Sequence, residues 1–377
     1  LLADPDSIRG DLLSYCAGIR PDGTNATIIG AKPGEFKADR NGIPRVWMDH
    51  GFWPVMTIAL YLDETGDDTF LLESQLYFRD QLPWRGEGDG RSEATVAYEG
   101  TVLEHLLTQT VTAFFDVGEH GHIRLRGADW NDGLDMARER GESVAFTAAY
   151  AYGLSLMSAM TRRLSACGQE NVTLRTALWE LMASAYGDVR VMQSALHRCC
   201  ASEDVTTQTV PVGELTRRLD EMAEEIRVHI RQQEWVSDGA DQHWFNSYYD
   251  NDGQPLEGLA GDRVRMMLTG QVFCLLAGVA DEAQAAQVVR AVDWYLCYPN
   301  RGGFCLNTDF DEVKLNMGRM FGFAYGHKEN GAVFCHMAVM YAYALYTRGF
   351  AAQGARVLEL LYAQSTNFSV SGILPGI

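Results

Sequence analysis

Positive charge and long apolar runs are both scarce in this chain. It has 31 Lys and Arg residues against 50 Asp and Glu residues, which gives a net charge of −19. Nucleic acids and anionic membranes bind basic faces, so neither is an expected partner. No apolar run reaches the roughly 18 residues that suggest a transmembrane helix. A small anion remains compatible with this composition, because a local pocket of Arg, Lys and His can hold phosphate inside an acidic protein.

Paired cysteines, a signal peptide and an initiating methionine are also missing. The eight cysteines are scattered, except for the adjacent Cys199 and Cys200, and no Cys-x-x-Cys pair occurs. This spacing predicts neither a zinc site nor a redox dithiol, and it indicates reduced, buried thiols in a cytoplasmic protein. The chain opens at Leu1 and stops at Ile377 without a targeting segment, so we expect it to be a piece of a longer polypeptide.

Apolar residues at helical spacing are what the chain does contain, in segments separated by Gly, Pro and polar loops. Hydrophobic residues make up 47% of the chain, enough for a substantial core. The pattern predicts short extended pieces at 121–125 and 303–307, and otherwise an all-α single domain over residues 1–377 in two helical layers. The predicted helices cover 54–64, 101–115, 144–164, 173–185, 212–233, 263–277, 282–296, 331–347 and 351–363.

Residues 127–135 form the most informative motif, with three carboxylates, an indole and an amide in nine positions. Gly127 and Gly133 flank the Trp-Asn-Asp core, so the backbone can turn sharply there. An aromatic ring beside acids is typical of a sugar site, because the ring stacks on a pyranose and a carboxyl group protonates the glycosidic oxygen. An ordinary turn between helices with one packed Trp is the alternative interpretation.

Two further motifs lie downstream, at 244–253 and at 326–336, where Lys-Glu-Asn-Gly is followed by a histidine. With the Trp-Asn-Asp-Gly motif they make the chain resemble the glycoside phosphorylases of glycoside hydrolase family 94, which includes cellobiose, chitobiose and 1,2-β-oligoglucan phosphorylases. Residues 45–49 and 327–336 are most similar to the 1,2-β-oligoglucan branch. The resemblance implies an (α/α)6 barrel, incomplete at its C-terminal end.

The resemblance also assigns roles to residues of the first and last motifs. It makes Asp132 the general acid and places the ring of Trp130 at the sugar subsite beside the broken bond. It makes His336 a phosphate ligand. It gives Lys328 and Glu329 hydrogen bonds to sugar hydroxyls on the acceptor and donor sides respectively.

By residue type alone, these positions have ordinary structural alternatives. Trp130 could be a core aromatic, and a lone histidine such as His336 is more often a core residue. A lysine next to a glutamate could be a surface ion pair. Asp129 and Asp135 could supply negative charge to the acid, or could cap helices and bond within the loop.

The segment around 45–49 is the third element of the resemblance. It implies that Arg45 and Asp49 bind the non-reducing-end sugar, with Arg40 as a competitor for the arginine. His50 departs from relatives that carry a second acid there. The aromatic and acidic stretch 244–252 could bind sugar or be a buried structural loop, and it stays outside the catalytic set.

The implied reaction is inverting phosphorolysis of a β-linked glucan, with β-1,2 the expected linkage. Phosphate is the nucleophile, so no second catalytic carboxylate, metal or organic cofactor is required. The products would be α-glucose 1-phosphate and a shortened glucan, and the oligosaccharide and inorganic phosphate are the expected partners. A homodimer is left open. The alternatives are an inverting hydrolase and a non-catalytic phosphorylase-like domain of a cyclic β-1,2-glucan synthase.

Overall fold

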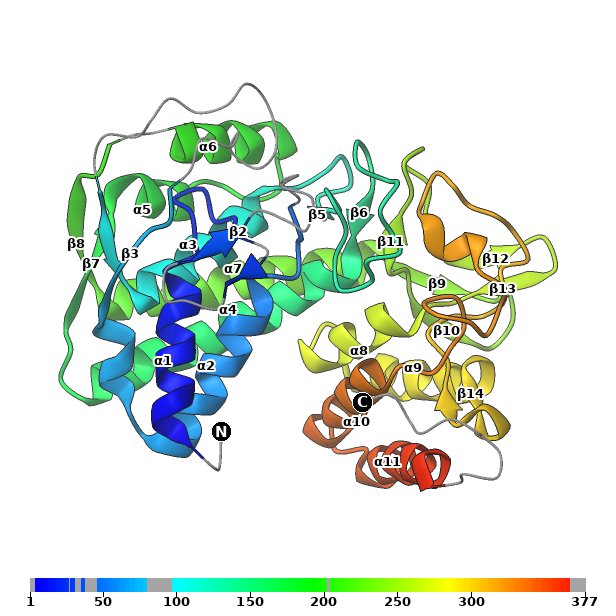
Figure 1. Ribbon diagram of the computed structural model, residues 1–377. Coiled ribbons are helices and arrows are strands. Elements are labelled where there is room, and N and C mark those ends of the chain that lie inside the picture. The colour runs from blue at the N-terminus through cyan, green and yellow to red at the C-terminus, as the bar shows by residue number, and fades with distance from the viewer. Residues whose placement is uncertain are drawn as a thin grey trace. The chain divides into compact units, whose positions relative to one another are not determined.

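The computed structural model describes residues 4–26, 28–30, 35–37, 46–79, 97–201 and 204–366 (Figure 1). The chain divides into two compact units, one formed by Leu1–Trp130 with Gly153–Glu225 and the other by Asn131–Tyr152 with Ile226–Ile377. Helices dominate both, and eleven α-helices lie within the described ranges. The strands there are only two to five residues long. The helix-rich prediction is therefore confirmed, while the (α/α)6 closure and the single domain 1–377 stay predictions.

The first unit is built around α3 (Val102–Phe115), whose residues are all buried. Thr101 begins this helix, and its side chain accepts a hydrogen bond from the Glu104 N–H at 3.2 Å. Helices pack around α3 on several sides, which explains why it carries almost no surface. They are α1 (Pro5–Cys16), α2 (Phe52–Thr65), α5 (Thr176–Met182) and α6 (Val189–Ala201).

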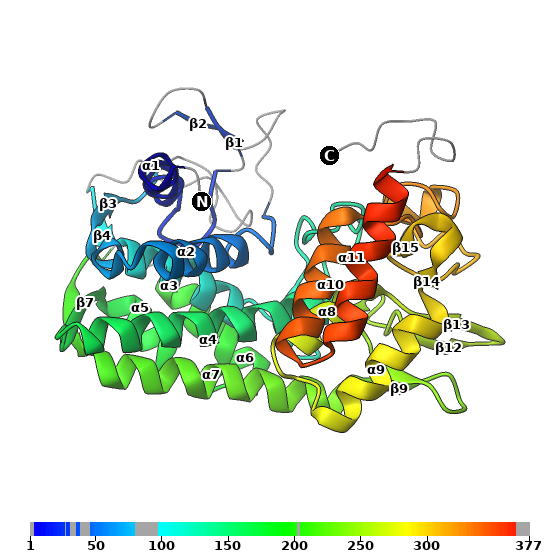
Figure 2. The same ribbon diagram turned by 90° about the horizontal axis from the view of Figure 1, so that it is seen from below.

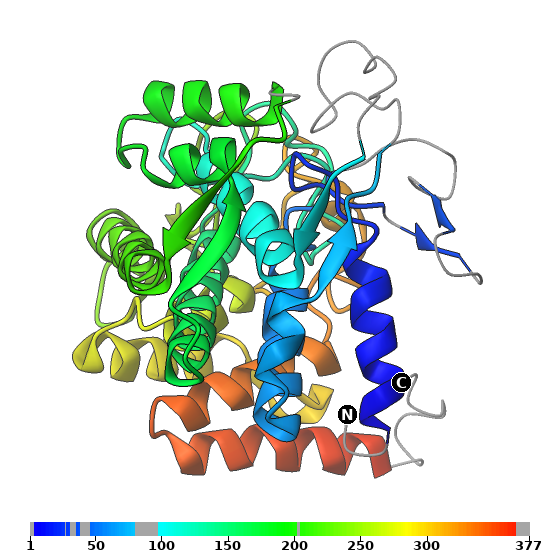
Figure 3. The same cartoon turned by 90° about the vertical axis from the view of Figure 1, so that its left-hand side faces the viewer.

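Antiparallel strand pairs position several helices of the first unit. Strand β3 (Ser74–Leu76) pairs with β4 (Glu99–Thr101), which leads directly into α3. Strand β7 (Asn171–Arg175) pairs with β8 (Thr207–Pro211), and Figure 3 shows them as two green arrows side by side. Helix α5 begins directly after β7, and α7 (Val212–Gln233) begins directly after β8. The antiparallel β7–β8 pair therefore sets where both helices start.

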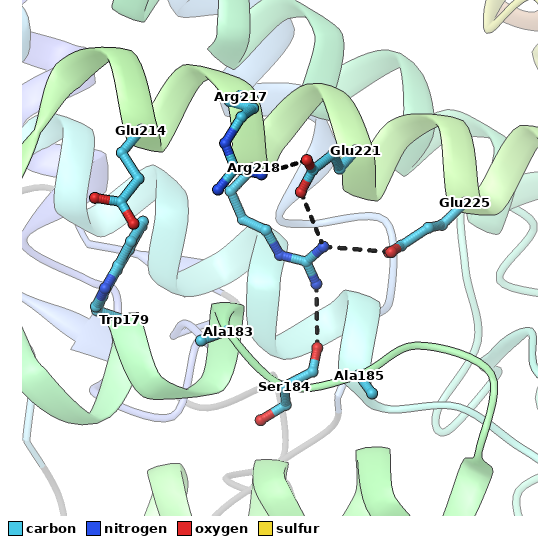
Figure 4. A pocket seen from close by; sticks show the side chains of 9 residues that line it. All are labelled: Trp179, Ala183, Ser184, Ala185, Glu214, Arg217, Arg218, Glu221 and Glu225. Atoms are coloured by element: carbon cyan, nitrogen blue, oxygen red, sulfur yellow. Dashed lines mark hydrogen bonds and ion pairs between the residues drawn. The ribbon is translucent and has the colours of Figure 1, made fainter.

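Arg218 on α7 closes a groove against α5 in the first unit (Figure 4). Its Nε donates to the Met182 carbonyl at 2.6 Å, and its Nη2 donates to the Ser184 carbonyl at 3.1 Å. These carbonyls follow the end of α5, where helices leave acceptors unsatisfied. Its Nη1 also pairs with Glu225 at 3.3 Å. The groove encloses about 310 Å³, and its arginine is committed to structural contacts.

The second unit contains α8 (Leu268–Leu276), α9 (Glu282–Tyr295), α10 (Cys335–Thr347) and α11 (Ala351–Thr366). All residues of α8 are buried, and α10 packs against both α8 and α11. Figure 2 shows α10 and α11 side by side. Short strands and turns connect the helices and carry the predicted motifs. They include β6 (Glu142–Ser143), β9 (Trp235–Ser237), β10 (His243–Phe245), β11 (Tyr248–Tyr249), β12 (Gly258–Ala260), β13 (Arg263–Arg265), β14 (Cys297–Tyr298), β15 (Gly303–Phe304) and the 3₁₀ helix η4 (Arg319–Gly322).

All nine predicted helices correspond to observed ones, including α4 (Val144–Ala166). Three predictions began too early. Residues 171–175 and 263–265 form strands, and the predicted helix at 331–347 begins only at Cys335. Helices α1 and α6 were not predicted. The predicted extended pieces contain β5 (Ile123–Arg124) and β15.

All eight cysteines carry free thiols. Burial was expected for them, and it is wrong for Cys167 and Cys335, which are exposed. Within the part of the chain described above, none of the helices has both the length and the apolar character to cross a membrane.

Candidate active site

The segment around Asp49 lies against the first half of the Trp-Asn-Asp-Gly motif in the first unit. The Gly127 N–H donates to the Val46 carbonyl at 2.9 Å, and the Met48 N–H donates to the Ala128 carbonyl at 3.0 Å. These two bonds form a parallel bridge between residues 47 and 128. The structure therefore brings together two motifs that the sequence placed about 80 residues apart.

Asp49 presents one free acceptor atom. Its side chain is buried, and its Oδ2 accepts a hydrogen bond from the Trp53 indole at 2.8 Å. Its Oδ1 is buried without a hydrogen-bond partner. A buried, unpaired carboxylate oxygen is costly, and it suits a sugar hydroxyl that donates when bound. Arg45 and its competitor Arg40 lie outside the described residues.

His50, the departure from the family pattern, follows Asp49 on the same turn. Its ring stacks with that of Trp47 at 6.1 Å between centroids, and its backbone carbonyl accepts a hydrogen bond from the Tyr15 hydroxyl at 2.9 Å. Burial lowers the pKa of His50 below its usual value, and the Asp49 charge opposes this shift. The imidazole is therefore neutral near pH 7, and it offers either a donor or an acceptor where an acid would offer acceptors alone.

The second half of the motif begins the second unit, because the division falls between Trp130 and Asn131. Trp130 itself is half-buried at the end of the first unit. We call residues 131–136 the acid loop. Asn131 is buried, and its side-chain Oδ1 accepts a hydrogen bond from the Gly133 N–H at 3.1 Å. The Leu134 N–H donates to the Asn131 carbonyl at 3.0 Å. The amide of the motif therefore folds the loop and leaves the neighbouring carboxylate pointing outward.

Asp132 is the exposed member of the acid loop, with 51% of its side chain accessible. Residues 317–320 pack directly against this loop. The Met320 N–H donates to the Gly133 carbonyl at 3.0 Å, and a Cβ atom on Gly318 would lie 2.0 Å from the same oxygen. Only glycine permits this approach at 318. The packing fixes the backbone on which Asp132 stands.

Arg319 bridges Asp132 and Asp135, the two acids of the loop, and the sequence interpretation missed it. Its Nη2 lies 3.0 Å from Asp132 Oδ2, and its Nη1 lies 2.6 Å from Asp135 Oδ2. Its backbone N–H also donates to Asp135 Oδ1 at 3.2 Å. Burial disfavours the charge, but Asp135, then Asp132 and Glu329, raise the pKa of Arg319 above its usual value. Asp135 therefore serves the site by anchoring an arginine rather than by capping a helix.

The Lys-Glu-Asn-Gly motif forms a tight turn in the second unit. The Gly326 N–H donates to the Asn330 carbonyl at 2.7 Å, and the Asn330 N–H donates to the His327 carbonyl at 3.1 Å. Lys328 adopts a left-handed conformation, with φ of 50°. Such a conformation is uncommon outside glycine and often marks a functional turn. The Asn330 side chain donates to the Phe323 carbonyl at 2.8 Å, which fixes the turn from inside.

The side chains of Lys328 and Glu329, the two charged residues of this turn, make different contacts. Lys328 places its Nζ 4.8 Å from the centroid of the Phe323 ring, a cation–π contact. Glu329 is half-buried, and its Oε2 is enclosed without a hydrogen-bond partner. The Glu329 charge acts on Arg319, which places the turn within electrostatic reach of the acid loop. The surface ion pair that residue types alone allowed for Lys328 and Glu329 is not formed.

A cavity of about 290 Å³ borders the same turn. It has aromatic walls and an acidic rim, which is the combination expected where sugar rings and hydroxyls are bound. Its lining comprises Asp309, Phe310, Asp311, Glu312, Val313, Phe321, Phe323, Tyr325 and Asn330.

His336 lies in the first turn of α10 and is exposed, so the core alternative for this histidine is wrong. The helix begins after Phe334, which provides no side-chain cap. The first N–H groups of a helix have no intrahelical acceptors and carry partial positive charge. A phosphate beside His336 could therefore meet backbone donors as well as an imidazole.

The stretch 244–252 is mostly structural. Trp244 and Tyr248 are fully buried. Asp250 is buried, and its Oδ1 accepts hydrogen bonds from the N–H groups of Asp252 and Gln254, both at 3.0 Å. Its Oδ2 accepts from the Asn316 side chain at 3.0 Å. Leaving this stretch outside the catalytic set therefore agrees with its bonding.

The family model for the catalytic domain of the glycosyl hydrolase 94 superfamily matches residues 19–362. The chain belongs to this superfamily. The match spans the acid loop, the Lys-Glu-Asn-Gly turn and His336, so the motifs described above all lie within the matched catalytic domain.

Curated relatives are similar at low identity. The chain is 25% identical over 293 residues to the solabiose phosphorylase of Paenibacillus borealis, covering 78% of the chain and 30% of that protein. It is 24% identical over 297 residues to the N,N'-diacetylchitobiose phosphorylase of Vibrio proteolyticus, covering 78% and 28% respectively. It is 22% identical over 322 residues to the cyclic beta-(1,2)-glucan synthase NdvB of Rhizobium meliloti (strain 1021), covering 85% of the chain and 10% of that protein. The chain thus spans less than a third of each of these relatives.

Proposed function

We propose that this chain carries the catalytic machinery of an inverting glycoside phosphorylase that cleaves a β-linked glucan with inorganic phosphate. The products are α-glucose 1-phosphate and a shortened glucan. The observation that carries the proposal is the acid loop, in which a bonded asparagine and a packed glycine pair hold Asp132 outward on a fixed backbone. Membership of the superfamily and the phosphorylase names of the relatives support this reaction class.

Asp132 is the proton donor in this mechanism. Its carboxyl group protonates the glycosidic oxygen while a phosphate oxygen attacks C1 from the opposite face. The bond from C1 to the glycosidic oxygen breaks, and its electron pair goes to that oxygen as it gains the proton. One displacement inverts C1, so a β-glycoside yields an α-phosphate. The nucleophile is already an anion, and no second carboxylate has to activate it.

His336 is the phosphate ligand in this account. An exposed imidazole in the first turn of a 13-residue helix offers a donor at a helix N-terminus, where the partial positive charge favours an anion. A local site of this kind can hold an anion even though the protein carries a net charge of −19.

Sugar binding is assigned to side chains with unused acceptors. Asp49 and Glu329 each keep a carboxylate oxygen without a hydrogen-bond partner, and sugar hydroxyls are donors that satisfy such atoms. Lys328, Arg45 and the ring of Trp130 complete the assignment by family resemblance. We further propose an (α/α)6 barrel, a β-1,2 linkage, a cytoplasmic location and no metal or organic cofactor, all on the resemblance to the 1,2-β-oligoglucan branch.

The similarity to NdvB supports a second candidate, a phosphorylase-like domain within a cyclic β-1,2-glucan synthase. An inverting hydrolase on the same fold is the third. The three differ in what they do with phosphate. A phosphorylase cleaves glucan only when phosphate is present, a hydrolase cleaves without it, and a non-catalytic domain does neither.

The test is an assay of the full-length protein on β-1,2, β-1,3 and β-1,4 glucans, each with and without phosphate. We expect glucose 1-phosphate from the β-1,2 glucan only when phosphate is added. Glucose release in phosphate-free buffer would favour the hydrolase, and no product under either condition would favour the non-catalytic domain.

A further inference from the structure

We propose that Arg319 is a positioning residue for Asp132, whose carboxyl group it holds in the direction needed for proton donation. This inference rests on the proposed function, because it takes Asp132 as the general acid. None of the sequence motifs includes this arginine. It lies on η4, contacts the acid loop and interacts electrostatically with Glu329 of the Lys-Glu-Asn-Gly turn.

Arg319 is anchored mainly by Asp135. Asp135 accepts two hydrogen bonds from it, one from the backbone N–H at 3.2 Å and one from Nη1 at 2.6 Å. These bonds fix both ends of the arginine side chain on one carboxylate. The remaining Nη2 is thereby directed at Asp132 Oδ2, 3.0 Å away. Because the guanidinium fork is rigid and planar, the direction of this third contact is set by the first two.

The position of the guanidinium among the acids supports this role. Three carboxylates face it in the described part of the site, namely Asp132 and Asp135 on the acid loop and Glu329 on the turn. Like charges repel one another, and the single guanidinium holds two of these carboxylates at ion-pair distance. If Arg319 is removed, Asp132 loses the ion pair that fixes its direction.

Aim and charge can be separated by two substitutions. Arg319→Gln removes both the cation and the rigid fork, whereas Arg319→Lys keeps the cation as a single point charge. Loss of aim should lower kcat at the pH optimum in both variants, by about tenfold or more, since general acid catalysis contributes about 10²–10⁴-fold. The loss of kcat should be smaller in Arg319→Lys, which keeps an attraction to the carboxylates. The KM values for glucan and for phosphate should stay near those of wild type in both variants, because Arg319 is assigned to neither substrate.

The experiment measures kcat, the KM for glucan and the KM for phosphate at the pH optimum of the wild type, for full-length wild type, Arg319→Gln, Arg319→Lys and Arg356→Gln. Arg356 is a matched control, because it forms an ion pair of 2.9 Å with Asp293 and contacts none of the proposed site residues. Melting temperatures check that each variant is folded.

The proposal predicts a lower kcat with nearly unchanged KM values for Arg319→Gln, a smaller loss of kcat for Arg319→Lys, and wild-type constants for Arg356→Gln. An equal loss of kcat in Arg319→Gln and Arg319→Lys together with a lowered melting temperature in both would reduce Arg319 to a structural role. A raised KM for phosphate with an unchanged kcat would make it a phosphate ligand instead. Failure of the proposed function is distinguishable, since wild type itself would then show no phosphate-dependent cleavage.

Discussion

Two acidic loops of the second unit, both sequence motifs of the same family, use their carboxylates in opposite ways. In the acid loop, Asp132 is half-exposed and has a single ion-pair partner. In residues 244–254, which we call the tyrosine loop, Asp250 is buried and its two oxygens accept bonds from two backbone N–H groups and one side-chain amide. The comparison shows that Asp132 keeps accessible oxygens, as its proposed role as proton donor requires, whereas the bonded oxygens of Asp250 hold the fold.

The largest effect should come from Asp132→Asn, which keeps the shape and removes the transferable proton. Phosphorolysis should fall by about 10²–10⁴-fold, the usual contribution of a general acid, while the melting temperature barely changes. Asp252→Asn is the matched control, because it alters an exposed carboxylate of the tyrosine loop. Near-normal turnover of Asp132→Asn, or an equal loss in Asp252→Asn, would break the distinction between the two loops.

Asp250→Asn should show the reverse pattern. The new amide places a donor against donors, and it weakens the pairing of Lys314, which lies 3.4 Å from Asp250 and is itself largely buried. Lost hydrogen bonds to a charged group cost about 1.5–3 kcal/mol, so denaturant unfolding should show a stability loss of that size. The folded fraction should keep its KM and kcat. A stable but inactive variant would place the tyrosine loop in the catalytic machinery.

His336→Ala should raise the KM for phosphate about tenfold, which corresponds to roughly 1.4 kcal/mol of one charge-assisted hydrogen bond. The KM for glucan should stay nearly constant, because the histidine is assigned to the anion alone. Steady-state kinetics with each substrate varied in turn would separate the two constants. Lost stability with unchanged phosphate affinity would return His336 to a structural role.

The smallest effect concerns Glu257, which follows the tyrosine loop and accepts hydrogen bonds from the Ser247 and Met267 N–H groups. Burial raises the pKa of Glu257 from 4.5 to about 8. A raised folded-state pKa gives stability that is fully present below about 4.5 and is lost as the pH rises through about 8. Glu257→Gln mimics the protonated form, so its melting temperature should vary less between these pH values. Glu359→Gln, at an exposed position on α11, should keep the wild-type slope.

Local sequence signals predicted most of the helices, because apolar spacing reports which face is buried. The predicted 212–233 coincides with the observed α7. Helix α6 was not predicted, because its first turn carries the β-branched Val189 and Val191. A signal for this helix was present, since Asp188 is a capping residue that accepts hydrogen bonds from the N–H groups of Arg190 and Val191. The strand at 171–175 was read as helix because its pairing partner lies at 207–211, beyond any local window.

The residues of the candidate site also differ in whether a local sequence pattern marks them. Asp132, Glu329 and His336 were readable because they stand within long motifs. Arg319 stands between glycine and methionine, and its role depends on the packing of 317–320 against Gly133, a tertiary contact without a local signature. The enclosure of Asp49 Oδ1 and Glu329 Oε2 without hydrogen-bond partners likewise results from tertiary packing, which no local sequence pattern reports. Sequence therefore indicated the proposed proton donor, and the structure added the arginine that forms an ion pair with it.

The most direct test of single-displacement phosphorolysis is proton NMR of the sugar phosphate, recorded during the first minutes of glucan cleavage by the full-length protein in phosphate buffer. The account predicts the anomeric signal of α-glucose 1-phosphate, formed with inversion by proton donation from Asp132 and attack by phosphate. A β-phosphate product would contradict the single displacement, and free glucose without any sugar phosphate would contradict phosphorolysis itself.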